Sequence, residues 1–118
     1  MNPLNYATLE ASKRLVDAGI VLETEQHHHE IVEWEGKQVK LTIPAPSMAE
    51  VWRELPEGFW YENKWTWICV TKSRKDGDTT YCAYYMPDDK AVCGSKRRNT
   101  NPTDALIDLL IWVRKEKP

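Results

Sequence analysis

The sequence predicts a single α+β domain, in which an antiparallel sheet of four or five strands carries three helices mainly on one face. Three observations predict this fold class. A strongly apolar helical stretch lies near the C-terminus, two shorter amphipathic stretches precede it, and the segments between them alternate apolar and polar residues as strands do. Most predicted strand connections are as short as hairpins, which favours antiparallel pairing. The 118 residues suit one domain spanning 1–118.

The C-terminal helix, predicted over residues 101–117, is the clearest element. Asn101 is a favoured N-cap, and Pro102 suits the first helical position because no N–H is needed there. Apolar residues recur at helical spacing, and they are Ala105, Leu106, Leu109, Leu110, Trp112 and Val113. Thr103, Asp104, Asp108 and the C-terminal charges remain for solvent. We therefore expect this helix and the first helix to supply most of the helical core.

The first part of the chain is predicted to form a helix and a hairpin. The helix covers 7–18 and ends at Gly19, a natural C-terminal stop. Strands follow at 26–34 and 37–43, joined by a turn at Glu35-Gly36. The second strand alternates strictly, so it should present one apolar and one polar face.

The next part is predicted to form a helix and a β-meander. Ser47 and Glu50 make a capping box that starts the helix, and Pro56 and Gly58 end it. Strands are expected over 59–61, 65–72, 79–86 and 90–93. Asp76-Gly77 is a strong two-residue hairpin signal. A basic loop over 94–100 leads into the last helix, which gives the order α-β-β-α-β-β-(β)-α.

Charge and composition exclude few classes of function. Residues 1–60 carry 5 basic and 10 acidic side chains, and residues 61–118 carry 11 and 8, so net charges of −5 and +3 give −2 overall. Neither half is extreme enough to argue for or against nucleic acid. No apolar run approaches the length of a membrane span and no secretory signal is present, so we expect a cytoplasmic protein that contacts no membrane. The three cysteines lack paired spacing and are expected to be reduced thiols.

Three segments together resemble a known family. They are N-Y-A-T-L-E-A-S-K-R-L-V-D-A-G (5–19), I-P-A-P-S-M-A-E-V-W-R-E-L (43–55) and N-P-T-D-A-L-I-D-L-L-I-W-V (101–113), about a third of the chain. Small proteins of bacteriophages and of mobile elements integrated in gut bacteria look similar. They share a first helix ending in A-G, a central P-S-x-x-E helix and a C-terminal N-P-x-D-A-L helix. The resemblance implies a mobile-element accessory protein, of a kind that often inhibits host machinery, and it implies no functional residue.

The aromatic hairpin over 65–86 is the strongest functional feature. One predicted face carries Trp65, Trp67, Tyr84 and Met86, and the opposite face is also largely apolar. A half-solvated antiparallel strand normally alternates apolar with polar residues, and helices on one side cover one face. The face with these four residues is therefore expected to bind a partner or, when no partner is present, to form a weak homodimer, unless a loop or residues 59–61 fold over it.

A second interpretation is a nucleic-acid or nucleotide binder. Basic residues cluster at the hairpin tip and in the loop before the last helix, and they are Lys72, Arg74, Lys75, Lys96, Arg97 and Arg98. Basic side chains beside exposed aromatic rings are typical of single-strand binding surfaces. The alternative is that these charges are solvated and keep a loop and a hairpin tip soluble.

A third, weaker interpretation is a metal-dependent enzyme at the histidine run. His27 and His29 share one strand face, where two imidazoles can bind one divalent metal, but the sequence offers no obvious third ligand. No nucleophile, phosphate-loop or zinc motif is present, so no catalytic, cofactor or metal residue is assigned. The sequence thus predicts a non-enzymatic protein that binds a host macromolecule, and its family resemblance adds inhibition of a host defence as the expected purpose.

Overall fold

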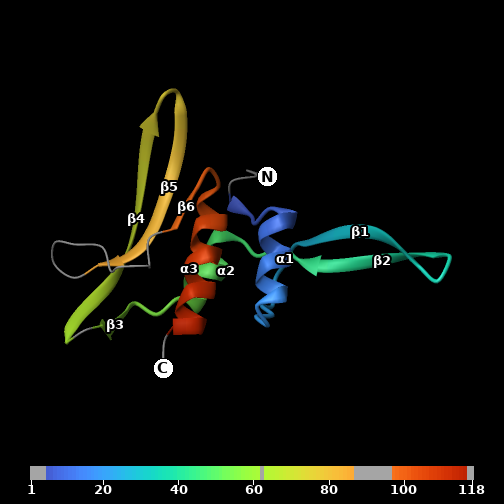
Figure 1. Cartoon of the computed structure of the whole chain (residues 1–118), viewed down its shortest axis with the longest axis horizontal. Helices are drawn as coiled ribbons and strands as arrows, with labels where there is room; N and C mark the ends of the chain where they lie inside the picture. Colours follow the sequence, from blue (N-terminus) through green and yellow to red (C-terminus); the bar gives the residue numbers. More distant parts are fainter. Residues whose placement is uncertain (1–4, 62, 87–96, 117–118) are drawn as a thin grey trace.

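The computed structural model describes residues 5–61, 63–86 and 97–116, and within them the chain forms three helices and six strands (Figure 1). The helices are α1 (Leu9–Asp17), α2 (Met48–Glu54) and α3 (Pro102–Glu116), and the strands are β1 (His27–Trp34), β2 (Lys37–Pro44), β3 (Gly58–Tyr61), β4 (Lys64–Lys75), β5 (Asp78–Met86) and β6 (Arg97–Asn99). All strand pairs are antiparallel. The predicted α+β class and element order are confirmed.

The strands form two sheets rather than one. A four-stranded sheet has the order β3-β4-β5-β6, whereas β1 and β2 pair with each other alone and project from the far side of α1 (Figure 1). We call the β1–β2 hairpin the arm. Its base is tied to the helical layer, because His28 Nε2 lies 2.8 Å from the Ala7 carbonyl and Lys13 forms a 2.7 Å ion pair with Glu30. These contacts direct the arm away from the main sheet and give the molecule its 55 Å long axis.

Helix α3 is the centre of the hydrophobic core. Six of its apolar residues are at most 2% exposed, and they are Ala105, Leu106, Ile107, Leu109, Leu110 and Val113. They pack against Leu15 of α1, Val51 of α2 and Tyr85 of β5. The expectation that Thr103 and Asp104 face solvent is wrong, since their exposed fractions are 0% and 4%.

Burial of Asp104 follows from a polar contact between the starts of α1 and α3. The backbone N of Thr8 donates to Asp104 Oδ1 at 3.0 Å, and the Thr8 hydroxyl donates to Oδ2 at 2.7 Å. Asn101, the predicted N-cap, accepts the N–H of Thr103 at 2.8 Å, and its own amide donates to the Tyr6 carbonyl at 3.1 Å. We call the contacts of Thr8 with Asp104 and of Asn101 with Tyr6 the helix clamp.

The local signals for turns and caps are confirmed. Ser47 and Glu50 form the predicted capping box, in which each side chain accepts a hydrogen bond from the other residue's backbone N–H. Both residues of the Asp76-Gly77 turn have positive φ, at 54° and 84°, as a type I′ turn requires. The segment predicted as a basic loop contains β6, and the strand predicted over 90–93 lies outside the described residues.

Replacing Leu109 or Leu110 by alanine should lower the free energy of unfolding by about 2–5 kcal/mol, because each side chain is fully buried and leaves a cavity. Thermal and chemical denaturation would measure the change. Val16→Ala on α1 is the control, since Val16 is 41% exposed. Equal stability of all three variants would contradict a core centred on α3.

Asp104→Ala should cost about 1–3 kcal/mol, because Thr8 loses the charged acceptor of two hydrogen bonds. Asp78→Ala, at the exposed end of β5, should change stability by no more than about 0.5 kcal/mol. Urea denaturation of both variants makes the comparison. A loss for Asp104→Ala no larger than that of the control would show that the clamp does not stabilise the fold.

Candidate functional site

The four-stranded sheet has one face toward the helices and one face away from them. The inner face carries Thr66, Ile68, Ala83 and Tyr85, and all four are buried or half-buried toward α3. Tyr85 is completely buried, and its hydroxyl donates to the Pro56 carbonyl at 2.6 Å. Burial raises the pKa of Tyr85 well above its ordinary value, so the hydroxyl stays protonated and remains a donor.

The outer face brings together the four residues predicted to bind a partner. The register places Trp67 opposite Met86 and Cys69 opposite Tyr84, so their side chains share the face that the helical core does not occupy. Trp65 is 47% exposed and Trp67 is 39% exposed, whereas Tyr84 and Met86 are half-buried. The four residues therefore form one surface, as the sequence predicts.

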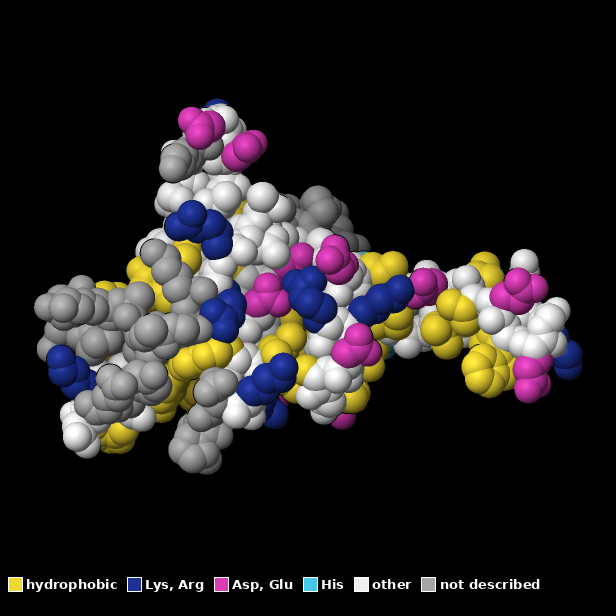
Figure 2. Space-filling model, viewed as in Figure 1, with side chains coloured by type: hydrophobic (Ala, Val, Ile, Leu, Met, Phe, Trp, Pro, Cys, Tyr) yellow, Lys and Arg dark blue, Asp and Glu magenta, His cyan; other side chains and the backbone are white. Residues whose placement is uncertain are grey.

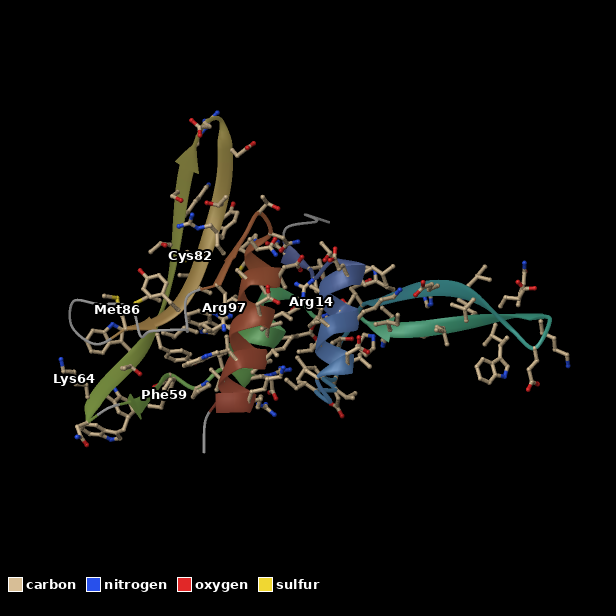
Figure 3. The ribbon with its side chains drawn as sticks, in the orientation of Figure 1. Arg14, Phe59, Lys64, Cys82, Met86 and Arg97 are labelled. Atoms are coloured by element: carbon tan, nitrogen blue, oxygen red, sulfur yellow. The ribbon has the colours of Figure 1, made fainter. Side chains whose placement is uncertain are left out.

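Trp60 belongs to the same surface and was missed by the sequence reasoning. Strand β3 pairs Trp60 with Trp65, and the two rings meet edge to face with their centroids 5.8 Å apart. The neighbouring Phe59 points to the opposite face, and its ring centroid lies 4.7 Å from that of Tyr85 (Figure 3). Residues 58–61 therefore extend the sheet as a further strand. Alternation along the short strand was the signal that could have found Trp60.

We call the set Trp60, Trp65, Trp67, Tyr84 and Met86 the aromatic surface. Trp60 is its most exposed member, at 70%. Large rings fixed in a sheet present a wide apolar area with little conformational freedom to lose on binding, and Trp and Tyr are enriched where proteins meet. The arrangement therefore exposes a wide, rigid apolar area on one face of the sheet.

Gly58 makes the packing beneath the aromatic surface possible. It pairs with Trp67, and a Cβ at this position would collide with the Thr66 carbonyl oxygen and come within 2.7 Å of Cζ2 of the Trp65 ring. The indole of Trp65 therefore occupies the space that a side chain at residue 58 would need. Gly58, which the sequence pattern predicts to end the preceding helix, begins β3 in the structure.

The predicted basic residues are divided between the two faces. Lys72, Arg74 and Arg97 share the inner-face register, and Lys72 Nζ lies 5.9 Å from the centre of the Tyr81 ring. Arg98 pairs with Cys82 and shares the outer-face register. The side chain of Lys75 and the whole of Lys96 lie outside what the structure describes. The described basic side chains thus do not form one patch beside the aromatic surface.

The histidine run lies at the base of the arm. His28 contacts the Ala7 carbonyl, and the other face of the arm carries His27 and His29, of which His29 Nδ1 lies 3.4 Å from the Thr42 hydroxyl. Among the described residues, no three His, Cys, Asp or Glu side chains come together as a metal site would require. The run therefore has a structural contact at His28 and offers two adjacent imidazoles on the exposed face.

Two of the three cysteines lie on the outer face of the sheet. Cys69 is half-buried and Cys82 is buried, and both are free thiols. Their register partners are Tyr84 and Thr71, so the two cysteines are diagonal neighbours rather than directly opposite. Cys93 lies outside the described residues.

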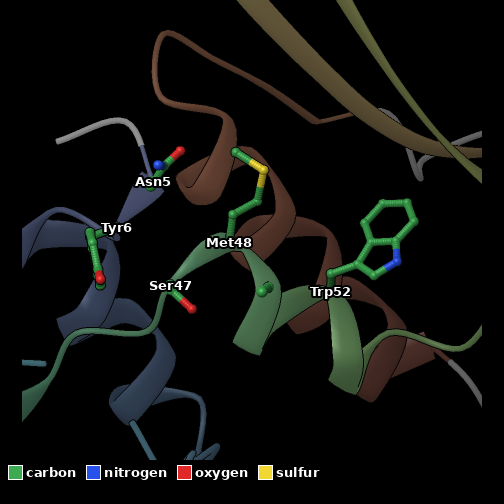
Figure 4. Close-up of a pocket in the computed structure, with 6 residues that line it drawn as sticks. Asn5, Tyr6, Ser47, Met48 and Trp52 are labelled. Carbon is green, nitrogen blue, oxygen red and sulfur yellow. The ribbon is translucent and has the colours of Figure 1, made fainter. Parts of the chain in front are cut away.

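A shallow groove lies beside α2, and none of its lining residues belongs to the aromatic surface (Figure 4). It encloses about 490 Å³ and is lined by Asn5, Tyr6, Ser47, Met48, Ala49 and Trp52. Met48 and Trp52 provide its apolar floor, and Trp52 is 46% exposed. The lining carries no ionisable pair that would suggest catalysis, and the groove offers a shallow apolar recess.

No family model matches the sequence, and no curated protein or solved structure matches it. Within the residues described, none of the helices combines the length and apolar character needed to cross a membrane.

Gly58→Ala should displace the Trp65 ring and weaken the pairing of β3 with β4, because the added methyl group has no space. We expect altered near-ultraviolet circular dichroism of the tryptophans and a loss of about 1–3 kcal/mol in stability. Thr71→Ala, at an exposed position of β4, is the control. An unchanged tryptophan spectrum for Gly58→Ala would contradict the contact between Gly58 and Trp65.

Proposed function

We propose that this protein is a non-enzymatic binding protein that attaches to a protein partner through the aromatic surface. The observation that carries the proposal is the exposure of three neighbouring tryptophans, at 70%, 47% and 39% for Trp60, Trp65 and Trp67, on a sheet face opposite the helical core. A contiguous apolar patch of this kind is costly in water and is typical of an interaction site.

A protein partner is favoured over nucleic acid because of the charges around the patch. Single-strand binders place cationic side chains along the same face as the stacking rings. Among the predicted basic side chains that the structure describes, Arg98 shares the outer-face register, whereas Lys72, Arg74 and Arg97 share the inner-face register. Burial of the rings against another apolar surface is therefore better supported than stacking of bases beside a row of phosphates.

The resemblance to proteins of phages and mobile elements extends the proposal to the partner's origin. We expect the partner to be a protein of the bacterial host, and the binding to inhibit a host defence system. This extension depends on the sequence resemblance alone, whereas the binding site depends on the geometry of the aromatic surface.

Trp60→Ser or Trp67→Ser should abolish capture of the partner or weaken it about tenfold or more, because each removes a large exposed ring from the aromatic surface. The wild-type protein would be used to capture partners from extracts of element-bearing bacteria. A partner identified by mass spectrometry would then be purified, and its affinity measured by calorimetry for each variant.

Trp52→Ser is the matched control, since Trp52 is 46% exposed but lies on α2. It should bind the purified partner like the wild type. Affinity should also change little between low and moderate salt, whereas phosphate contacts would weaken steeply. Equal affinity of the Trp67→Ser and wild-type proteins would refute the proposed site.

A further inference from the structure

The arm carries a second apolar strip that its own chain leaves uncovered. On one face of the hairpin, Trp34 is 67% exposed, Val39 is 38% exposed and Leu41 is 42% exposed. The register places these three residues on the same face as Val32. We call Val32, Trp34, Val39 and Leu41 the arm strip. Figure 2 shows hydrophobic side chains along the projecting arm, with acidic ones between them.

An isolated two-stranded hairpin is only marginally stable in water and normally needs another layer to cover its apolar face. At the base of the arm, α1 and the residues just before it supply that layer, through the Lys13–Glu30 ion pair and the contact of His28 with Ala7. Toward the tip, Trp34 and its neighbours extend beyond the helix. We infer that a second copy of this chain covers the arm strip, in a twofold dimer in which each arm lies on the aromatic surface of the other copy.

The exposed side-chain area distinguishes between the possible ways in which two copies of the chain could meet. From their exposed fractions, the three tryptophans of the aromatic surface offer about 400 Å² and the arm strip about 300 Å² of side-chain area. Two aromatic surfaces meeting would bury about 800 Å² and two arm strips about 600 Å², both below the ~1,000 Å² of a specific interface. The reciprocal contact uses all four surfaces and buries about 1,400 Å², which is within the usual range.

Shape and charge are consistent with the reciprocal arrangement. The arm and the aromatic surface lie toward opposite ends of the 55 Å long axis, so an antiparallel pair places each arm beside the other copy's sheet (Figure 1). The arm, His27–Pro44, carries three acidic and two basic residues, whereas strands β3 to β6 carry one acidic and six basic residues. This difference in charge favours the antiparallel orientation over a parallel one.

The inference shares the aromatic surface with the proposed function but does not depend on the partner, so purified protein alone tests it. Sedimentation velocity over about 5–200 µM should show a concentration-dependent dimer of the wild type. Trp34→Ser and Trp67→Ser should each weaken dimerisation about tenfold or more, because each damages both reciprocal contacts. Val39→Ser is a second arm variant, for use if Trp34→Ser does not fold.

The chain offers a close control. Ile31 is 67% exposed, like Trp34, but it lies on the opposite face of the arm. Ile31→Ser should dimerise like the wild type. A strictly monomeric wild type, or equal weakening by Ile31→Ser and Trp34→Ser, would overturn the arrangement.

Mixing the two variants gives the decisive result. A mixture of Trp34→Ser and Trp67→Ser can form a heterodimer in which the intact arm of one meets the intact aromatic surface of the other. Its other contact lacks both rings, but because the two rings would lie in one contact, losing the second costs less than losing the first. The heterodimer, followed by fluorescence transfer between labelled copies, should therefore be stronger than either variant's homodimer. A mixture no stronger than the separate variants would show that the arm and the aromatic surface do not meet, and would leave partner binding by the aromatic surface unaffected.

Discussion

The hydrogen bonds of Thr8 with Asp104 hold together parts of the chain that are 96 residues apart, and the arrangement of the helices depends on them. They fix the start of α1 against the start of α3. The Arg14 guanidinium, at 3.1 Å from Asp108 Oδ1, holds the two helices together about one turn further on (Figure 3). With α1 fixed in this way, Ala11 and Leu15 enter the core, and the arm that follows α1 must leave on the side away from the sheet.

The same constraint explains why the sheet has two different faces. Helix α3 packs on β5 and β6, so it covers Ala83 and Tyr85 and leaves the alternate residues of β4 and β5 on the other side. Side chains alternate between the two faces of a strand, so one layer of helices covers only every second apolar residue of β4 and β5. The other half lies on the outer face, where Trp65 and Trp67 are exposed, and this is the face that we propose to bind a partner.

Periodicity and local chemistry predicted the elements well because helices, caps and two-residue turns are determined by neighbouring residues. The capping box at Ser47, the Asp76-Gly77 turn and the apolar stripe of α3 are of this kind. The arm's separation from the sheet and the burial of Asp104 depend on contacts distant in sequence, such as Asp104 with Thr8, and no local pattern encodes them. The alternation of side chains along β4 and β5 predicts that Trp65, Trp67, Tyr84 and Met86 share one face. Placing Trp60 beside them required knowledge that β3 pairs with β4.

The distance along the chain between the two halves of the helix clamp also affects how the protein folds. During synthesis, α1 leaves the ribosome long before α3, its partner in the core, has been made. Until α3 arrives, the core-facing side of α1 and the inner face of the β4–β5 hairpin lack the helix that covers them in the folded protein, so both stay exposed to solvent. Closing such a large loop is slow compared with forming the local hairpins. Folding is therefore expected to end with the docking of α3, in a late step that joins preformed pieces.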